Sequence, residues 1–256
     1  MRFAFYIAAF LFLVSCSFSD NIRMVSCSFP ENDVLIENRV GTATSKRYIS
    51  DSLSTINEHE NNLLLRLDQL MADSVKTQAD LNRTISGWGE IKNYVEKLRP
   101  SGFLPSDKKL AGKWFLMNLE LLKMTGATKY ADEMEKLLYM PDPGFFPDEE
   151  GLKRAIYTKM NDQVYVNLFW NSSAHYGHTT GGAVRIMQET NYPEGNRVSI
   201  RFETTDKRFV ELYVRIPSEV PQASVEVGGV KYKAVPGEYC RVAKKWKTGD
   251  VVEISL

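Results

Sequence analysis

The stretch Phe209-Val210-Glu211-Leu212-Tyr213-Val214-Arg215-Ile216 decides the fold class of this chain. Apolar and polar residues alternate along it, so every second side chain would lie on one face of an extended strand. The stretch Val164-Tyr165-Val166-Asn167-Leu168-Phe169 has the same period. Turn-forming residues separate such stretches, at Tyr192-Pro193-Glu194-Gly195-Asn196, Gly228-Gly229, Pro236-Gly237 and Thr248-Gly249-Asp250. The pattern predicts about eight short strands that form an antiparallel β-sandwich domain over residues 163–256.

Helical periodicity is found upstream of the sandwich, over residues 50–140. Apolar residues recur every three or four positions from Leu53 to Met71, which indicates one amphipathic helix or two. Further helices are predicted at 91–98, at 110–124, and from Thr128 as the N-cap to Tyr139. The helix at 110–124 carries one apolar stripe, formed by Leu110, Trp114, Met117 and Leu121. We expect the earlier helices to cover this stripe in a small bundle, or a protein partner to cover it instead.

The first residues have the features of an export signal. Arg2 precedes an apolar run from Phe3 to Val14 that is too short to span a bilayer, so residues 1–15 are expected to be a signal peptide. The run ends in Leu13-Val14-Ser15-Cys16, which matches a bacterial lipobox. We therefore expect lipid attachment at Cys16, export to the bacterial cell envelope, and membrane contact through the lipid anchor alone. Ordinary signal cleavage near Ser19 is the alternative.

Two further segments are assigned by composition. Residues 16–49 are polar without a sustained period and are predicted to be a tether. Residues 141–162 begin with Pro141-Asp142-Pro143-Gly144 and are predicted to link the helices to the sandwich. The chain has 32 basic and 32 acidic residues, so no basic field is present that would attract nucleic acid. With Cys16 lipidated, only Cys27 and Cys240 remain, and a disulfide between them is left open.

The order of several strand sequences resembles a known family. These are Tyr165-Val166-Asn167-Leu168-Phe169, then 184–193, then Leu212-Tyr213-Val214-Arg215-Ile216-Pro217, and finally 237–242 followed by Trp246-Lys247-Thr248-Gly249-Asp250. The set resembles the C-terminal β-sandwich of glycoside hydrolase family 127, the β-L-arabinofuranosidases. Residues 114–126 and 129–139 resemble the last helix pair of that family's (α/α)6 catalytic barrel. The resemblance implies an α+β fold in which an N-terminal helical bundle, a remnant of the barrel, precedes an antiparallel β-sandwich. Most of the barrel is expected to be missing.

The resemblance also implies a catalytic apparatus that this sequence does not supply. Family 127 enzymes use a cysteine nucleophile in a zinc site of one glutamate and three cysteines. By resemblance, Asp107 falls at the glutamate and Lys109 at a thiolate, and a lysine ammonium has no lone pair to give to a metal. The adjacent cysteine pair would fall near Phe145-Phe146-Pro147. We therefore assign no catalytic residue, no metal ligand and no cofactor, and we interpret Cys240 as a small core residue.

Two sets of residues are nevertheless candidates for sugar chemistry. Trp170, His175, Tyr176 and His178 offer flat apolar faces with hydrogen-bonding edges and are candidate saccharide contacts. His175-x-x-His178 would be a metal pair only if a carboxylate converged on it. The second set consists of carboxylates, because glycosidases commonly use two of them: Asp132, Glu133, Glu135, Asp148, Glu149 and Glu150. Asp132 and Glu135 are expected on a solvated helix face, and the acidic run 148–150 is expected to begin a short helix.

Three functional hypotheses follow from the sequence. The first is a non-catalytic envelope relative of the arabinofuranosidases that binds arabinose-containing glycans or another glycan-degrading protein. The second is an active glycoside hydrolase that uses carboxylates in place of cysteine, and a pocket with convergent carboxylates would distinguish it from the first. The third is an internally deleted remnant with no function.

Overall fold

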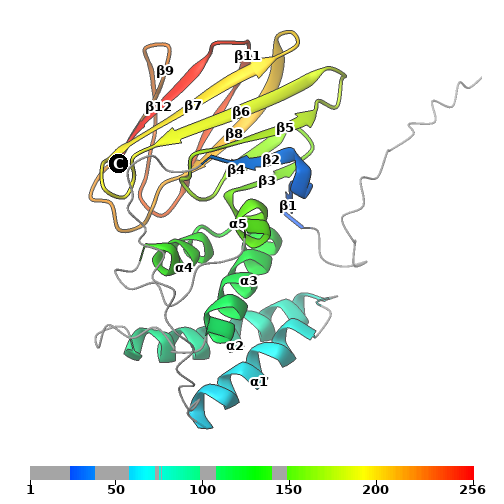
Figure 1. The fold of residues 1–256 in the computed structure, drawn as a ribbon, viewed down its shortest axis with the longest axis vertical. Helices are drawn as coiled ribbons and strands as arrows, with labels where there is room; N and C mark the ends of the chain where they lie inside the picture. The colour runs from blue at the N-terminus through cyan, green and yellow to red at the C-terminus, as the bar shows by residue number, and fades with distance from the viewer. Residues whose placement is uncertain (1–23, 38–57, 73–74, 76, 99–107, 140–148) are drawn as a thin grey trace, which may run out of the picture.

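The computed structural model describes residues 24–37, 58–72, 75, 77–98, 108–139 and 149–256. It is an α+β protein, as the sequence predicts, in which helices lie at one end of a two-sheet sandwich (Figure 1). The described helices are α1 (Glu58–Ala72), α2 (Gln78–Leu98), α3 (Lys108–Thr125), α4 (Lys129–Leu138) and α5 (Glu149–Ile156), with a 3-10 turn η1 (Glu31–Asp33). In none of these helices is the apolar stretch long enough to cross a membrane.

The described strands form a five-stranded and a seven-stranded sheet. The five-stranded sheet has the order β1 (Cys27–Ser28), β3 (Tyr157–Met160), β4 (Gln163–Val166), β8 (Arg208–Arg215) and β11 (Tyr239–Trp246). The seven-stranded sheet has the order β10 (Val230–Tyr232), β9 (Ser224–Val227), β12 (Val251–Ser255), β7 (Arg197–Thr204), β6 (Ala183–Thr190), β5 (Ser172–Gly177) and β2 (Val34–Ile36). Every recorded strand pair is antiparallel except β4 with β8, which is parallel.

The alternation in the sequence places one side of each long strand between the sheets. Val210, Leu212 and Val214 of β8 are fully buried, and β7 buries Val198, Ile200 and Phe202 in the same way: these inner faces form the sandwich core. Across the core, the ring of Phe202 stacks on the indole of Trp246 with centroids 3.9 Å apart. The chain reverses between β9 and β10 at Gly228 and Gly229, which both have positive φ, a conformation that glycine adopts without steric cost.

The tether predicted over residues 16–49 is wrong for the residues of that segment that form β1 and β2. Strand β1 pairs with β3 at one edge of the five-stranded sheet, and β2 pairs with β5 at one edge of the seven-stranded sheet. Between these strands Phe29 is buried and packs edge-on against the rings of Tyr157 and Tyr176. A segment this short has no detectable period, because each strand is only two or three residues long. We call residues 24–37 the N-terminal arm.

The linker predicted over residues 141–162 is also wrong for its second half. Helix α5 occupies Glu149–Ile156, with Glu149 and Glu150 in its first turn as the sequence predicts, and β3 follows without a break. The sandwich therefore begins at Tyr157 and takes two further strands from the N-terminal arm. Residues 140–148 lie outside the described residues.

The apolar stripe of α3 is covered by other helices of this chain. Leu110, Trp114, Met117 and Leu121 are all buried. The indole of Trp88 in α2 stacks on that of Trp114 at 5.8 Å, and its Nε1 donates to the Oδ1 of buried Asn118 at 2.8 Å. Helix α1 also packs on α3, so the expected small bundle is present. Thr128 stands at the N-cap of α4 but makes no capping bond; its hydroxyl donates instead to the carbonyl of Gly237 in the sandwich.

Candidate functional site

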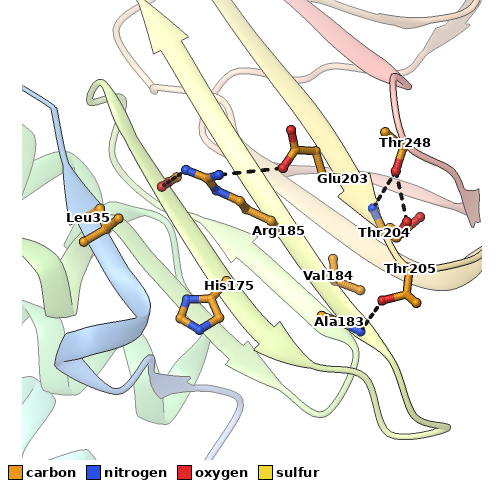
Figure 2. Close-up of a pocket in the computed structure, with 10 residues that line it drawn as sticks. Leu35, His175, Ala183, Val184, Arg185, Glu203, Thr204, Thr205 and Thr248 are labelled. Atoms are coloured by element: carbon orange, nitrogen blue, oxygen red, sulfur yellow. Dashed lines mark hydrogen bonds and ion pairs between the residues drawn. The ribbon is translucent and has the colours of Figure 1, made fainter.

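A depression of about 630 Å³ lies on the outer face of the seven-stranded sheet, across β2, β5, β6 and β7 (Figure 2). Its polar side chains include residues of three neighbouring strands: buried Ser173 and exposed His175 on β5, Arg185 on β6 and Glu203 on β7. Leu35 of β2 closes one side with an exposed aliphatic side chain. The volume falls within the range of small-molecule sites.

Three of these side chains form one row across the sheet. His175 is the register partner of Arg185, and Arg185 is the register partner of Glu203. Arg185 Nη1 lies 3.7 Å from Glu203 Oε2, and Arg185 Nη2 donates to Ser173 Oγ at 3.4 Å. His175 Nε2 lies 3.3 Å from Asp33 Oδ1 of the N-terminal arm. These separations exceed those of well-formed charge-assisted hydrogen bonds, so the groups retain capacity for another partner.

The opposite end of the depression is fixed by threonine hydroxyls. The backbone N–H of Thr204 donates to Thr248 Oγ1 at 3.0 Å, and that hydroxyl donates to the Thr204 carbonyl at 3.0 Å. The N–H of Ala183 donates to Thr205 Oγ1, also at 3.0 Å. These bonds hold the ends of β6 and β7 and the turn before β12 in one arrangement. The row therefore lies next to strand ends that hydrogen bonds join to one another.

The four predicted saccharide contacts are not brought together. Only His175 lines the depression. Its neighbour Tyr176 faces the core, where burial raises the pKa of its phenol and its ring packs against Phe29. His178 is buried, with Nε2 bonded to the carbonyl of Phe209 and lying 3.3 Å from Asp162 Oδ2. Trp170 precedes β5, and its carbonyl accepts from Ser172 and Gln188.

The prediction that Asp132 and Glu135 lie on a solvated helix face is wrong. Both carboxylates are buried, and both are bound by Arg215, the last residue of β8, whose side chain is fully buried. Arg215 Nη1 donates to Asp132 Oδ1 at 2.5 Å, Nη2 donates to Glu135 Oε1, and Nε donates to the carbonyl of Asn167 at 2.5 Å. We call Arg215, Asp132 and Glu135 the buried triad. It joins α4 to the sandwich.

Polar neighbours surround the buried triad. Tyr192 Oη donates to Glu135 Oε2 at 3.3 Å, and the backbone N–H of Ser218 reaches Asp132 Oδ1 at 3.4 Å. Burial raises the pKa of Glu135, and the cation of Arg215 opposes that effect in part. The two carboxylates raise the pKa of Arg215, so the guanidinium stays charged. The three charged groups of the buried triad are thus bound to each other inside the protein.

Other predicted site residues have separate locations. Cys16, Asp107, Asp148 and residues 145–147 lie outside the described residues. Lys109 lies in α3, and Glu149 forms an ion pair with Lys153 at 2.8 Å. Glu133 is buried beside α4's own Lys136, whose Nζ lies 3.4 Å from its carboxylate. In the part of the chain that the structure describes, no three His, Cys, Asp or Glu side chains converge as metal ligands would.

Cys240 is a free, buried thiol, and burial raises its pKa to about 11. The disulfide between Cys27 and Cys240 that the sequence left open is therefore absent. The thiol faces the core of the five-stranded sheet, where its register partner is Val214. This agrees with the interpretation of Cys240 as a small core residue.

Sequence reasoning missed most of the residues that line the depression. Arg185 and Glu203 stand at outward positions of strands in which buried and exposed residues alternate. A charged residue is common at such a position, and it indicates a site only when its neighbours on the adjacent strands are known. Asp33 and Leu35 lie in the segment interpreted as a tether. The register of β5, β6 and β7 would have revealed the row, but register between strands cannot be read from one sequence.

Comparison with known proteins identifies the sandwich. Residues 163–256 match the family model described as "Beta-L-arabinofuranosidase, GH127 middle domain". The matched domain is thus described as a middle domain, whereas the resemblance had indicated the C-terminal sandwich. No curated protein sequence matches the chain.

Solved structures agree on the fold. A GH127 β-L-arabinofuranosidase from Geobacillus stearothermophilus T6 has 21% sequence identity and a TM-score of 0.51, over 58% of this chain and 31% of that one. A GH127 β-arabinofuranosidase has 23% identity and a TM-score of 0.50, over 58% and 32%. A protein described as a glycoside hydrolase has 22% identity and a TM-score of 0.51, again over 58% and 32%. The match thus spans about a third of these structures' length, and at such identities it shows the fold alone.

Proposed function

We propose that this chain, whose residues 163–256 match the GH127 middle-domain model, is a non-catalytic relative of the β-L-arabinofuranosidases that binds saccharide in glycan utilisation. It would act at the bacterial cell envelope, anchored by a lipid on Cys16. The arabinofuranosidase activity belongs to the proteins named above. For this chain, an arabinose-containing glycan is the proposed ligand.

The residues present do not fit the zinc and cysteine chemistry that the resemblance implies. The sequence has three cysteines, Cys16, Cys27 and Cys240, and the last is a buried core thiol. With its pKa raised to about 11, the thiol of Cys240 is protonated at neutral pH and is a poor nucleophile. Lys109, which lies in α3, is the residue that the resemblance sets at a thiolate position.

The observation that carries the non-catalytic proposal is the commitment of Asp132 and Glu135 to Arg215. A carboxylate mechanism needs two carboxyl groups on either side of a bound glycosidic bond. Asp132 and Glu135 do converge, but on a fully buried guanidinium. This pairing removes Asp132 and Glu135 from the candidates for a carboxylate mechanism.

One observation favours the active hydrolase as a second candidate. A depression of about 390 Å³ beside β9 and β12 is lined by Glu226 and Glu253, which are register partners across the two strands. Directly opposed residues on neighbouring strands have Cβ atoms about 5 Å apart, so the two carboxyl groups can reach the separation of about 5–5.5 Å that retaining glycosidases use. Asp250 also lines it, but Lys244 Nζ at 3.0 Å neutralises that carboxylate and holds its pKa low despite burial.

A hydrolysis assay separates the two candidates. The purified full-length chain would be incubated with p-nitrophenyl β-L-arabinofuranoside and with arabino-oligosaccharides, and its metal content would be measured. We expect no enzyme-dependent release and no stoichiometric zinc. Turnover lost in Glu226→Gln or Glu253→Gln would establish the second candidate, whereas turnover with one bound zinc per chain would contradict the non-catalytic proposal outright. A chain that fails to fold when expressed would support the third hypothesis, a remnant without function.

A further inference from the structure

Three of the arginine–carboxylate contacts of the sandwich differ in distance and in exposure to solvent. In the buried triad, Arg215 is fully enclosed. On the outer face of the five-stranded sheet, Arg241 binds Glu211 through two bonds, at 2.8 and 3.2 Å, and the hydroxyl of Tyr213 also donates to Glu211 at 2.8 Å. In the depression, Arg185 and Glu203 are separated by 3.7 Å, and each side chain is nearly half exposed. Only this last pair is both open to solvent and inside a cavity.

We infer that the depression across β2, β5, β6 and β7 is a binding site for an uncharged saccharide, with Arg185 and Glu203 as its principal hydrogen-bonding groups. The inference rests on the proposed function and assigns the binding role to one face of the domain. That face is the outer surface of the seven-stranded sheet, away from the buried triad.

Charge balance argues for an uncharged ligand. Arg185 and Glu203 face each other, so an anion or a cation entering the depression would meet charges of both signs. The other polar lining consists of hydroxyl groups, those of Ser173, Thr205 and Thr248 among them. A polyol presents donors and acceptors on neighbouring carbon atoms and can use both kinds of group. A guanidinium only donates hydrogen bonds and a carboxylate only accepts them. Arg185 can therefore donate to one sugar hydroxyl while Glu203 accepts from the adjacent one.

The apolar part of the lining suits the other surface of a sugar ring. Leu35 is 55% exposed, although leucine of a strand is usually turned inward, and it lies across the depression from the threonine hydroxyls. Its side chain offers an aliphatic wall to the C–H groups of a saccharide. The wall comes from β2, so the N-terminal arm completes the site.

Calorimetric titration of the purified full-length chain tests the inference. Arabino-oligosaccharides and xylo-oligosaccharides are the uncharged probes, and oligogalacturonate is the acidic comparator. We expect saturable binding of at least one uncharged series and weaker binding of oligogalacturonate. Arg185→Met and Glu203→Gln should each weaken that binding about 10-fold or more, because each leaves a ligand hydroxyl without its partner, and Leu35→Ala should weaken it several-fold.

Arg201→Met is the matched control. Arg201 lies on the same face of β7, in register with Met187 and Val251, and does not line the depression. The Arg201→Met variant should bind the uncharged oligosaccharides as tightly as the unaltered chain does. Equal loss in Arg201→Met, no binding of either uncharged series, or preference for oligogalacturonate would overturn the inference. Hydrolysis of the uncharged probes, by the unaltered chain and equally by Arg185→Met, would instead contradict the non-catalytic proposal. Failure of the binding site and failure of the proposed function therefore give different results.

Discussion

Arg215 at the end of β8 donates to Asp132 in α4 over 2.5 Å, and the two residues are 83 positions apart in the sequence. The arginine also binds Glu135, so one sandwich side chain holds two carboxylates of one helix. Breaking a buried ion pair on one side costs about 3–5 kcal/mol, because a desolvated charge is left behind. The contact therefore fixes how the helices attach to the sandwich.

Replacing Arg215 by Met should destabilise the chain in a pH-dependent way. Without the cation, the hydrogen bond from Tyr192 alone opposes the effect of burial, so the pKa of Glu135 rises further above its unfolded value. A folded-state pKa above the unfolded value gives stability that is present at low pH and lost as pH rises through the folded pKa. Urea unfolding should show a penalty that is small near pH 4 and grows to about 3–5 kcal/mol at neutral pH.

Arg241→Met is the control for that prediction, because Arg241 pairs with Glu211 on a surface. Hydrogen bonds from Arg241 and Tyr213 hold the pKa of Glu211 low, so its contribution is present above the unfolded pKa and lost as pH falls. The loss in free energy of unfolding caused by Arg241→Met should be much smaller than that of Arg215→Met and constant above about pH 5. A pH-independent loss in Arg215→Met, or no recovery when Asp132→Asn and Glu135→Gln are added, would refute the account of the buried triad.

The N-terminal arm should contribute strongly to the stability of the sandwich. Phe29 is 3% exposed and packs on Tyr157 and Tyr176. Phe29→Ala should lower the free energy of unfolding by about 3–5 kcal/mol, the usual cost of removing a buried aromatic ring. Leu35→Ala, in the same arm but exposed, should change it by about 0.5 kcal/mol or less. Equal small effects of the two substitutions in thermal melts would show that the arm is not docked.

Trp88 should be necessary to cover the apolar stripe of α3. Trp88→Ala removes the ring stacked on Trp114 and leaves the amide of Asn118 without its indole donor. We expect a stability loss of about 3–5 kcal/mol and increased fluorescence of a hydrophobic dye, because the stripe becomes accessible. Leu65→Ala, at a residue of α1 that is 60% exposed, should leave dye binding unchanged. Unaltered dye fluorescence in Trp88→Ala would mean that other side chains cover the stripe.

Lipid attachment at Cys16 is expected from the lipobox, and the residue lies outside the described part of the chain. Cys16→Ala should move the protein out of the membrane fraction or leave the precursor unprocessed, and it should abolish labelling by radioactive palmitate. One sulfur cannot carry both a lipid and a disulfide. Cys240 is free and buried, so Cys27 is the cysteine of this chain with which Cys16 could form a disulfide. A Cys16–Cys27 disulfide found by mass spectrometry would contradict lipid attachment at Cys16.

Local patterns predicted most of the elements of this fold. Period-two alternation located the long strands of the sandwich, and three-to-four spacing located α1, α3 and α4. The parallel pairing of β4 with β8 had no local signal, because the two strands come from distant segments. The two strands of the N-terminal arm were too short to show a period. Each of these misses depends on a contact between distant parts of the chain.

The candidate site was less predictable for the same reason. Asp132 and Glu135 have the spacing of an ordinary surface pair, and their burial depends on Arg215, which follows them by 83 and 80 positions. Aromatic and imidazole groups after residue 169 suggested a saccharide loop, yet alternation along β5 turns His175 outward and Tyr176 inward. Arg185 and Glu203 become a pair only through strand register.

The N-terminal arm has a consequence for the order of folding. The hydroxyl of Ser28 donates to the carbonyl of Arg154, 126 positions away, and both strands of the arm pair with segments that are synthesised long after it. Closing a loop of that length costs about 4 kcal/mol of chain entropy beyond a constant, so contacts this distant form slowly. Until the arm arrives, β3 and β5 each present an unpaired edge, where a second nascent chain can add. The interval between synthesis and docking is when this protein is most exposed to aggregation.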